Sequence, residues 1–149
     1  AGTEPPATAL LLFDTDRFKR YNDLYGHLAG DRVLKAIAGI LLREVQGTSG
    51  LACRIGGEEF ALILSGTTEA DTLACAERVR RAVAAESIPH AGQDHGVVTV
   101  SCGVVHTARS PDLTPEQWYK AADVCLYEAK QRGRNRVEVA GWVPEEAGP

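Results

Sequence analysis

The stretch Arg54-Ile55-Gly56-Gly57-Glu58-Glu59-Phe60 decides the local fold. Two glycines stand directly before two carboxylates, between the mainly apolar runs 51–55 and 60–64. Gly-Gly between apolar runs predicts a tight β-hairpin, because two-residue hairpin turns need positive φ angles that glycine adopts readily. Two adjacent acids at a hairpin tip repel each other, and a bound divalent cation would explain their presence.

A second apolar run ends in carboxylates further upstream, at Phe13-Asp14-Thr15-Asp16. Mg²⁺ is held in proteins by carboxylate oxygens together with water and substrate phosphates. Two strand ends that carry acids therefore predict a Mg²⁺ site for phosphate chemistry, with Mn²⁺ as an alternative ion.

The composition bounds the class of protein. The chain has 149 residues, enough for one domain with a real core, and 44% of them are hydrophobic. With a net charge of -4, nothing in the composition argues for a nucleic-acid or membrane surface. No apolar run is long enough to span a bilayer, and residues 1–6 do not resemble a signal peptide. The expected location is cytoplasmic, with a membrane anchor elsewhere in a longer protein left open.

Hydrophobic periodicity predicts the order β-α-β-β-α-β-α-β, an α/β sandwich with a mixed sheet. Thr114-Pro115-Glu116-Gln117 is a capping box that starts the last helix. We interpret residues 1–8 as a linker or cloning remnant, 9–140 as the domain and 141–149 as a C-terminal tail. Besides the hairpin, the predicted strands are 9–13, 97–106 and 136–139, and the predicted helices are 28–45, 69–85 and 115–132.

The four cysteines are predicted to be buried free thiols in a reducing compartment. They all lie in apolar patterns, and none is within 20 residues of another, so local spacing offers no metal-ligand pair. They are Cys53, Cys75, Cys102 and Cys125.

The Gly-Gly-Glu-Glu-Phe run is one of several short sequence blocks along the chain that occur in a fixed order. Together these blocks resemble the GGDEF family, the diguanylate cyclases, over about residues 9–140. The run 14–23 resembles the family's D-x-D-x-F-K-x-x-N-D. The other blocks are Gly26-His27, Gly30-Asp31, the strand-like 99–104, the helix-like 122–130, and Gly133-Arg134-Asn135.

The resemblance implies a fold and a reaction. The fold is palm-like, ferredoxin-related and similar to that of nucleotidyl cyclases. The reaction joins two GTP molecules into cyclic di-GMP and releases two pyrophosphates, with Mg²⁺, as each ribose 3′-hydroxyl attacks an α-phosphorus. It implies a homodimer for catalysis and a sensor domain in the full-length protein. The alternative is a non-catalytic GGDEF module that binds GTP or cyclic di-GMP.

The resemblance also implies the metal ligands. These are Asp14, Glu59 and the backbone carbonyl of Thr15, with Glu58 close by as a further ligand and the candidate to deprotonate the 3′-hydroxyl. The division of roles between the two glutamates stays open. For Asp16 we expect a helix N-cap role instead.

Phosphate binding is expected at the turn after Asp14. Free N–H groups at the helical start Arg17-Phe18-Lys19 bind anions. The resemblance adds three basic ligands, which are Lys19, Lys130 and Arg134.

For the guanine base, Asn22 and Asp31 match the family's ligands. A carboxylate accepts both the N1–H and the exocyclic amine of guanine, a donor pair that adenine lacks. His27 and Leu34 are candidates for the pocket lining, and a packed structural role is the alternative for His27.

Two departures from the family matter. The motif of its first helix, D-x-L-T-G-L-x-N-R, is missing before Asp14, so we expect a trimmed catalytic domain. The inhibitory R-x-x-D motif is missing as well, because its positions hold Gly47 and Gly50. Cyclic di-GMP is therefore expected at the active site. Arg78 matches a secondary arginine that contributes to product binding in some family members, but on its own it is interpreted as a solvated helix charge. An adenylate-cyclase type is disfavoured by Asp31 and the hairpin.

Overall fold

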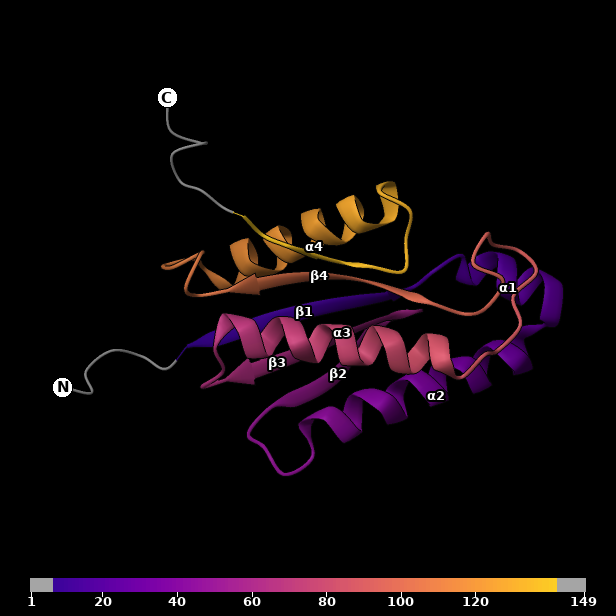
Figure 1. Ribbon diagram of the computed structural model, residues 1–149, viewed down its shortest axis with the longest axis horizontal. Coiled ribbons are helices and arrows are strands. Elements are labelled where there is room, and N and C mark those ends of the chain that lie inside the picture. Colours follow the sequence, from indigo (N-terminus) through magenta and orange to yellow (C-terminus); the bar gives the residue numbers. More distant parts are fainter. Residues whose placement is uncertain (1–6, 142–149) are drawn as a thin grey trace.

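The structure, a computed structural model, describes residues 7–141. Most of the expected linker 1–8 and of the tail 141–149 lies outside the described residues. Figure 1 shows a layered α/β arrangement, with helices on both faces of one sheet.

One five-stranded sheet forms the centre of the molecule, with the strand order β2-β3-β1-β4-β5. Every neighbouring pair is antiparallel except β4 and β5, which are parallel, so the predicted mixed sheet is confirmed. The strands are β1 (Thr8–Thr15), β2 (Leu51–Gly56), β3 (Glu59–Ser65), β4 (Val100–His106) and β5 (Val137–Val139).

The described residues form four helices, three of which pack on the sheet. The predicted helix 28–45 is only the second of two, because a separate short helix precedes it and the chain turns between them at Gly26, with φ of 91°. The predicted capping box at Thr114 is confirmed, with both reciprocal bonds to Gln117 present. The helices are α1 (Phe18–Tyr25), α2 (His27–Val45), α3 (Glu69–Ala85) and α4 (Pro115–Gln131).

One predicted strand begins later than expected. Residues 97–99 lie outside β4, because this segment turns away to pair with the loop before it: Val97 forms an isolated bridge with Pro89. The carbonyl of Thr99 instead accepts the backbone N–H of Asp16 at 2.9 Å.

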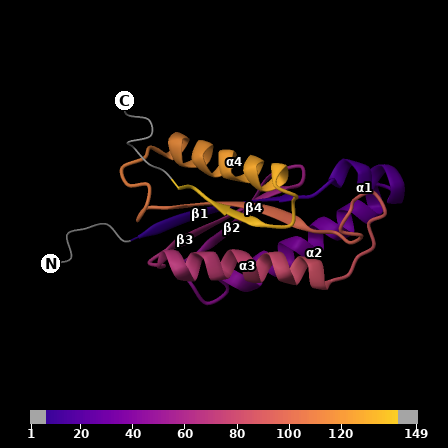
Figure 2. The ribbon, with the colours of Figure 1, turned by 45° about the horizontal axis from the view of Figure 1, so that its top comes forward.

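The helices form two layers, with α2 and α3 on one face of the sheet and α4 on the other (Figures 1 and 2). The larger core lies on the α2 and α3 side, where Phe13, Ile37 and Val79 are fully buried. The smaller core lies under α4, around Leu12 and Leu126. Two-sided covering explains the continuous apolar run that the sequence shows in β1.

Close approach of α4 to the sheet depends on Gly103 in β4. A Cβ atom there would lie 2.2 Å from the carbonyl oxygen of Ala122 and 2.5 Å from the nitrogen of Leu126. Both are backbone atoms that cannot move aside, so only glycine lets α4 rest directly on β4. The consequence for the site is that the end of α4 reaches Asp14.

The cysteine prediction is partly wrong. All four thiols are free, and Cys75, Cys102 and Cys125 are buried, but Cys53 is exposed. Its strand, β2, is one of the two edge strands of the sheet and is largely exposed along its length. An edge strand has a neighbour on one side only, so an apolar pattern does not guarantee burial there.

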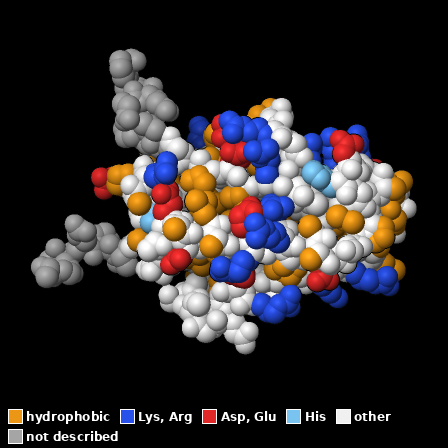
Figure 3. All heavy atoms as spheres, in the orientation of Figure 1, with side chains coloured by type: hydrophobic (Ala, Val, Ile, Leu, Met, Phe, Trp, Pro, Cys, Tyr) orange, Lys and Arg blue, Asp and Glu red, His pale blue; other side chains and the backbone are white. Residues whose placement is uncertain are grey.

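Charged side chains of both signs are interspersed on the face that carries α3 (Figure 3). Several are paired: Arg80 and Arg81 both contact Glu77, and Arg78 contacts Glu44 at 2.9 Å. Arg78 is thus a paired surface charge, in keeping with its interpretation as a helix charge. Within residues 7–141, no helix has both the length and the apolar character needed to cross a membrane.

Candidate active site

The predicted hairpin is present, but its tip lies one residue later than expected: Gly56 ends β2, and the two turn residues are Gly57 and Glu58. Gly57 has φ of 51°, and the guanidinium of Arg54 donates from Nε and Nη2 to the Gly57 carbonyl at 3.0 and 2.7 Å. The strand register places Asp14 directly opposite Glu59 on the neighbouring strand. Residues opposite each other in antiparallel strands share a face of the sheet. The two acid-bearing strand ends therefore meet, as the sequence predicts.

Thr15 ties the end of β1 to the hairpin tip. Its backbone N–H and its side-chain hydroxyl both donate to the carbonyl oxygen of Glu58, at 3.2 and 3.3 Å. The backbone positions of Asp14, Thr15 and Glu58 are therefore fixed relative to one another.

Asp14 carries an unusual charge environment. It is buried, and its Oδ2 lies 3.0 Å from Nζ of Lys130. Burial raises the pKa of Asp14 to about 6, the Lys130 ammonium lowers it, and the charges of Glu58 and Glu59 raise it. Because burial and like charges outweigh the single ammonium, a further cation would be favoured beside this carboxylate.

A charged pocket of about 310 Å³ opens beside Asp14. It gathers the end of β1, the start of α1, the hairpin tip and the end of α4. All but one of its lining residues are predicted site residues, and the exception is Arg20. The lining residues are Asp14, Thr15, Arg17, Phe18, Lys19, Arg20, Glu58, Lys130 and Arg134.

The start of α1 has the backbone form expected of an anion site. Arg17 adopts a left-handed conformation, with φ of 53°, and no side chain caps the helix at this residue. The N–H groups of the first turn of a helix attract anions. The Arg17 carbonyl accepts a hydrogen bond from Nε2 of His90 at 3.0 Å, and Gly92 N–H donates to the other ring nitrogen, which makes Nε2 the protonated nitrogen.

The expected N-cap role of Asp16 is wrong. Arg17 is the N-cap residue of α1, and Asp16 is buried. Its carboxylate accepts hydrogen bonds from the hydroxyls of Ser101 and Thr99, both at 2.7 Å, and from the Asn135 N–H at 3.1 Å. Burial raises the pKa of Asp16, and these hydrogen bonds lower it.

This hydrogen-bond network fixes the position of Arg134, which the sequence predicts as a phosphate ligand. Arg134 and Asn135 both have positive φ, 64° and 48°, in the turn that follows α4. Left-handed backbone at residues other than glycine is strained and needs support from its surroundings. The bond from Asn135 to Asp16 supplies that support and holds Arg134 at the edge of the charged pocket.

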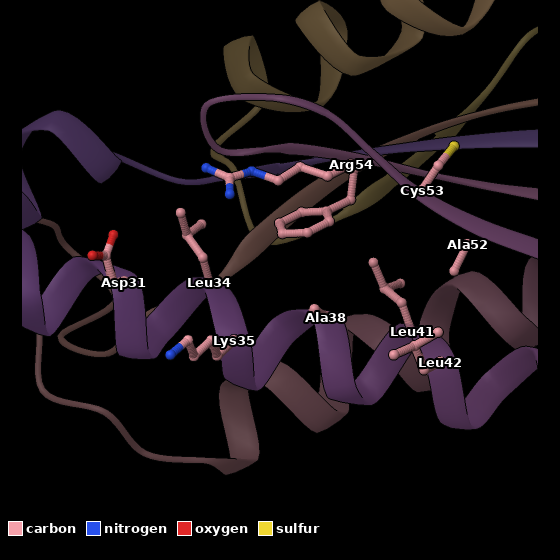
Figure 4. Close-up of a pocket in the computed structure, with 10 residues that line it drawn as sticks. Asp31, Leu34, Lys35, Ala38, Leu41, Leu42, Ala52, Cys53 and Arg54 are labelled. Atoms are coloured by element: carbon pink, nitrogen blue, oxygen red, sulfur yellow. The ribbon is translucent and has the colours of Figure 1, made fainter.

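The predicted guanine ligands divide between two places. Asp31 and Leu34 line a groove of about 420 Å³ between α2 and β2. Figure 4 shows both on the helix, with Arg54 on the strand across from them and Ala38 and Leu41 further along.

Asn22 and His27 line neither of these cavities. His27 is exposed at the start of α2. The Oδ1 of Asn22 is buried without a hydrogen-bond partner in the part of the chain that the structure describes. It lies where a Cβ of Gly30 would be, only 1.9 Å from that position, so Gly30 makes room for Asn22. An orphaned amide oxygen of this kind is suited to a ligand's donor.

The donors fit a magnesium ion in type, although they are not gathered as a preformed cage. Among residues 7–141, no group of three or more His, Cys, Asp or Glu side chains is placed to hold a metal. Mg²⁺ commonly takes one or two carboxylates and completes its shell with water and substrate phosphates. Asp14 and Glu59, opposed across two strands, meet that requirement.

Sequence reasoning missed two residues at this site. Arg20 lines the charged pocket and also donates to the Gly92 carbonyl at 3.2 Å. The Tyr119 hydroxyl donates to Oε1 of Glu59 at 2.8 Å. Tyr119 could have been found from the sequence. It lies close to three full helical turns before the predicted ligand Lys130, and therefore on the same side of the helix.

The comparisons with known proteins agree with this geometry. The family described as "Diguanylate cyclase, GGDEF domain" matches residues 2–136, so the chain belongs to the GGDEF family. It is 39% identical over 141 residues to diguanylate cyclase A of Treponema denticola, covering 94% of this chain and 37% of that protein. It is 45% identical over 134 residues to the response regulator PleD of Caulobacter vibrioides, covering 89% of this chain and 29% of that protein. The chain thus spans about a third of the length of these relatives.

Solved structures of GGDEF domains show the same fold. The GGDEF domain of DgcB from Caulobacter crescentus, in complex with c-di-GMP, matches with a TM-score of 0.81 and 32% identity over 92% of this chain and 80% of that one. The active GGEEF domain of a diguanylate cyclase from Vibrio cholerae matches with a TM-score of 0.76 and 28% identity, over 92% of this chain and 85% of that one. The predicted palm-like α/β fold is confirmed.

Proposed function

We propose that this chain is the catalytic domain of a diguanylate cyclase, which condenses two GTP molecules into cyclic di-GMP and releases two pyrophosphates. One observation carries the proposal: a single pocket gathers a carboxylate pair and a basic set from three distant parts of the chain. The pair is Asp14 and Glu58, and the basic set includes Lys19, Lys130 and Arg134. Membership of the GGDEF family supports the same reaction.

The metal-binding role is proposed for Asp14, Glu59 and the Thr15 carbonyl, with Glu58 beside them. A bound Mg²⁺, or Mn²⁺ in its place, would offset triphosphate charge and polarise the reacting phosphoryl group. The raised pKa of Asp14 supports the assignment, because a carboxyl held among like charges gains from a nearby cation. Glu58 lines the pocket and is the proposed acceptor of the 3′-hydroxyl proton.

The triphosphate is proposed to lie against the start of α1 and the end of α4. The N–H groups at Arg17, Phe18 and Lys19 offer hydrogen bonds to phosphate oxygens. The side chains of Lys130 and Arg134 offer positive charge from the end of α4 and from the turn after it. In this arrangement Lys130 exchanges its contact with Asp14 for a phosphate contact.

Guanine selection is proposed for Asp31 and Asn22. Asp31 would accept hydrogen bonds from the N1–H and the exocyclic amine. The Asn22 Oδ1, which has no hydrogen-bond partner among residues 7–141, would accept from a further donor. Leu34 lines the same groove as Asp31, whereas His27 is exposed and outside it. A base without two donors on this edge would leave Asp31 unpaired and be rejected.

Catalysis is proposed to need two chains, because each site holds one GTP and each 3′-hydroxyl must face the α-phosphorus of the other. Cyclic di-GMP, the product, is proposed to bind at the active site and to compete there with GTP. Its guanine groups fit the same ligands, and Gly47 and Gly50 supply no charged side chain for the family's separate inhibitory motif. In the full-length protein, a sensor domain would control the pairing of two catalytic domains. The use of GTP as substrate supports a cytoplasmic location.

The direct test is incubation with GTP and Mg²⁺, followed by identification of the product by mass spectrometry. We expect cyclic di-GMP, with a rate that rises faster than linearly with protein concentration. Glu58→Gln should stop turnover, and Glu86→Gln, an exposed acid at the end of α3, is the matched control. GTP binding without any product from the parent chain would favour the non-catalytic module instead.

A further inference from the structure

Tyr119 on α4 is the only residue that hydrogen-bonds the Glu59 side chain within residues 7–141. Its hydroxyl donates to Oε1 of Glu59 at 2.8 Å, and its side chain is 40% exposed. The hydroxyl is the donor in this contact, because an ionised carboxylate only accepts hydrogen bonds.

The same face of α4 serves both acids of the candidate metal site. Tyr119 and Lys130 are separated by close to three full turns, so they lie on one stripe of the helix. Lys130 contacts Asp14 at 3.0 Å, and Tyr119 contacts Glu59, which is opposite Asp14 in the strand register. Each acid is thus engaged by a side chain of α4.

The position of Glu59 differs from that of its neighbours. Asp14 and Glu58 line the charged pocket, and Glu59 does not. Tyr119 belongs to the first half of α4, whereas Lys130, near the end of that helix, lines the pocket. The Tyr119 hydroxyl therefore draws the Glu59 carboxylate toward the half of the helix that lies away from the pocket.

We propose that Tyr119 is a positioning residue that holds the Glu59 carboxylate out of the charged pocket, so that Glu59 must release the tyrosine hydroxyl before it ligates a divalent cation. This inference rests on the proposed cyclase site. It assigns Tyr119 the role of setting cation affinity. The hydrogen bond joins a charged acceptor to a half-exposed donor, so its loss should tighten cation binding by about three- to tenfold.

The test measures Mn²⁺ binding to the whole chain without nucleotide, from the electron paramagnetic resonance signal of free Mn²⁺. Tyr119→Phe removes the hydroxyl and keeps the ring, and we expect its Mn²⁺ dissociation constant to fall by about three- to tenfold. Tyr119→Leu should shift it in the same direction. Tyr127→Phe is the matched control on the same helix, at a tyrosine that is 63% exposed, and should bind Mn²⁺ as the parent does.

A Glu59→Gln background separates this inference from the proposed function. In that background, Tyr119→Phe should leave the Mn²⁺ dissociation constant unchanged. Tyr119 is proposed to act on the cation only through the Glu59 carboxylate, which the glutamine replaces. If Glu59→Gln weakens Mn²⁺ binding but Tyr119→Phe leaves the affinity unchanged or lower, the role of Tyr119 is overturned and the metal site stands. An effect of Tyr119→Phe that persists with Glu59→Gln also overturns it. No saturable Mn²⁺ binding by the parent would overturn the role of Tyr119 in setting cation affinity, whereas the proposed cyclase function is decided separately by product formation from GTP.

Discussion

Asp14 and Asp16 lie two positions apart at the end of β1, and their surroundings are opposite in kind. Asp16 is 1% exposed and accepts three hydrogen bonds from neutral donors, two hydroxyls and a backbone N–H. Asp14 is 9% exposed and faces one ammonium group and two further carboxylates. Nearly equal burial therefore accompanies two different roles.

The comparison shows that the type of partner separates a structural acid from a reactive one. The partners of Asp16 are fixed in β4 and in the turn after α4, so its carboxylate joins segments and has no freedom to take another ligand. The partner of Asp14 is Lys130, whose side chain is 30% exposed and can move to another anion. A buried acid with an exchangeable partner is suited to binding a cation or substrate.

The largest expected effect comes from Asp14 itself. Asp14→Asn should lower cyclic di-GMP formation by at least about a thousandfold, because metal-assisted phosphoryl chemistry depends on several kcal/mol of charge stabilisation. Product formation at saturating GTP and Mg²⁺ is the measurement. Turnover within tenfold of the parent would show that Asp14 does not hold the cation.

Asp16 should matter for stability first. Asp16→Ala leaves two buried hydroxyls and a backbone N–H without their acceptor, so we expect the free energy of unfolding to fall by about 3–5 kcal/mol. Urea denaturation followed by circular dichroism measures this. The control is Asp94→Ala, an exposed acid in the loop before β4, which should change stability by less than about 0.5 kcal/mol. A loss below about 1 kcal/mol for Asp16→Ala would contradict the network's importance.

The pH dependence of stability should separate Asp14 from an ordinary surface acid. Folding raises the pKa of Asp14 from its usual 3.8 to about 6, so its favourable contribution is complete below pH 3.8 and disappears as the pH rises through 6. Without metal, Asp14→Asn should therefore gain stability relative to the parent between pH 4 and 7.5, by at most about 3 kcal/mol. A difference that stays constant across this range would refute the raised pKa.

The smallest effect concerns Lys130. The Lys130 ammonium lowers the pKa of Asp14, so Lys130→Met should raise that pKa further. The proton affinity of Asp14 should increase by less than about tenfold. Titration of the Asp14 carboxyl carbon by nuclear magnetic resonance measures the change. Lys120→Met, an exposed lysine on the same helix, is the control and should leave Asp14 unaffected. An unchanged Asp14 pKa in Lys130→Met would mean that the ion pair is absent in solution.

Features set by neighbouring residues were predictable from the sequence. The hairpin, the capping box at Thr114 and the apolar run of β1 all appear in the structure, with the two turn residues of the hairpin one position later than the sequence places them. Each depends on a few adjacent residues, through φ angles, local hydrogen bonds or periodicity. Helix boundaries were less certain: α1 has only 8 residues and ends at Gly26, too short to show a periodic pattern of its own.

By itself, then, the sequence determined the two acid-bearing strand ends and most of the residues that line the pocket. Turns, caps and family motifs each depend on a few residues that are adjacent in the sequence. Only the tertiary structure decided the role of Asp16, the exposure of Cys53 and the contact of Tyr119 with Glu59. The partners of Asp16 are 83, 85 and 119 residues away, and Tyr119 is 60 residues from Glu59. Such contacts depend on strand order and on how closely α4 packs at Gly103, which no local pattern encodes.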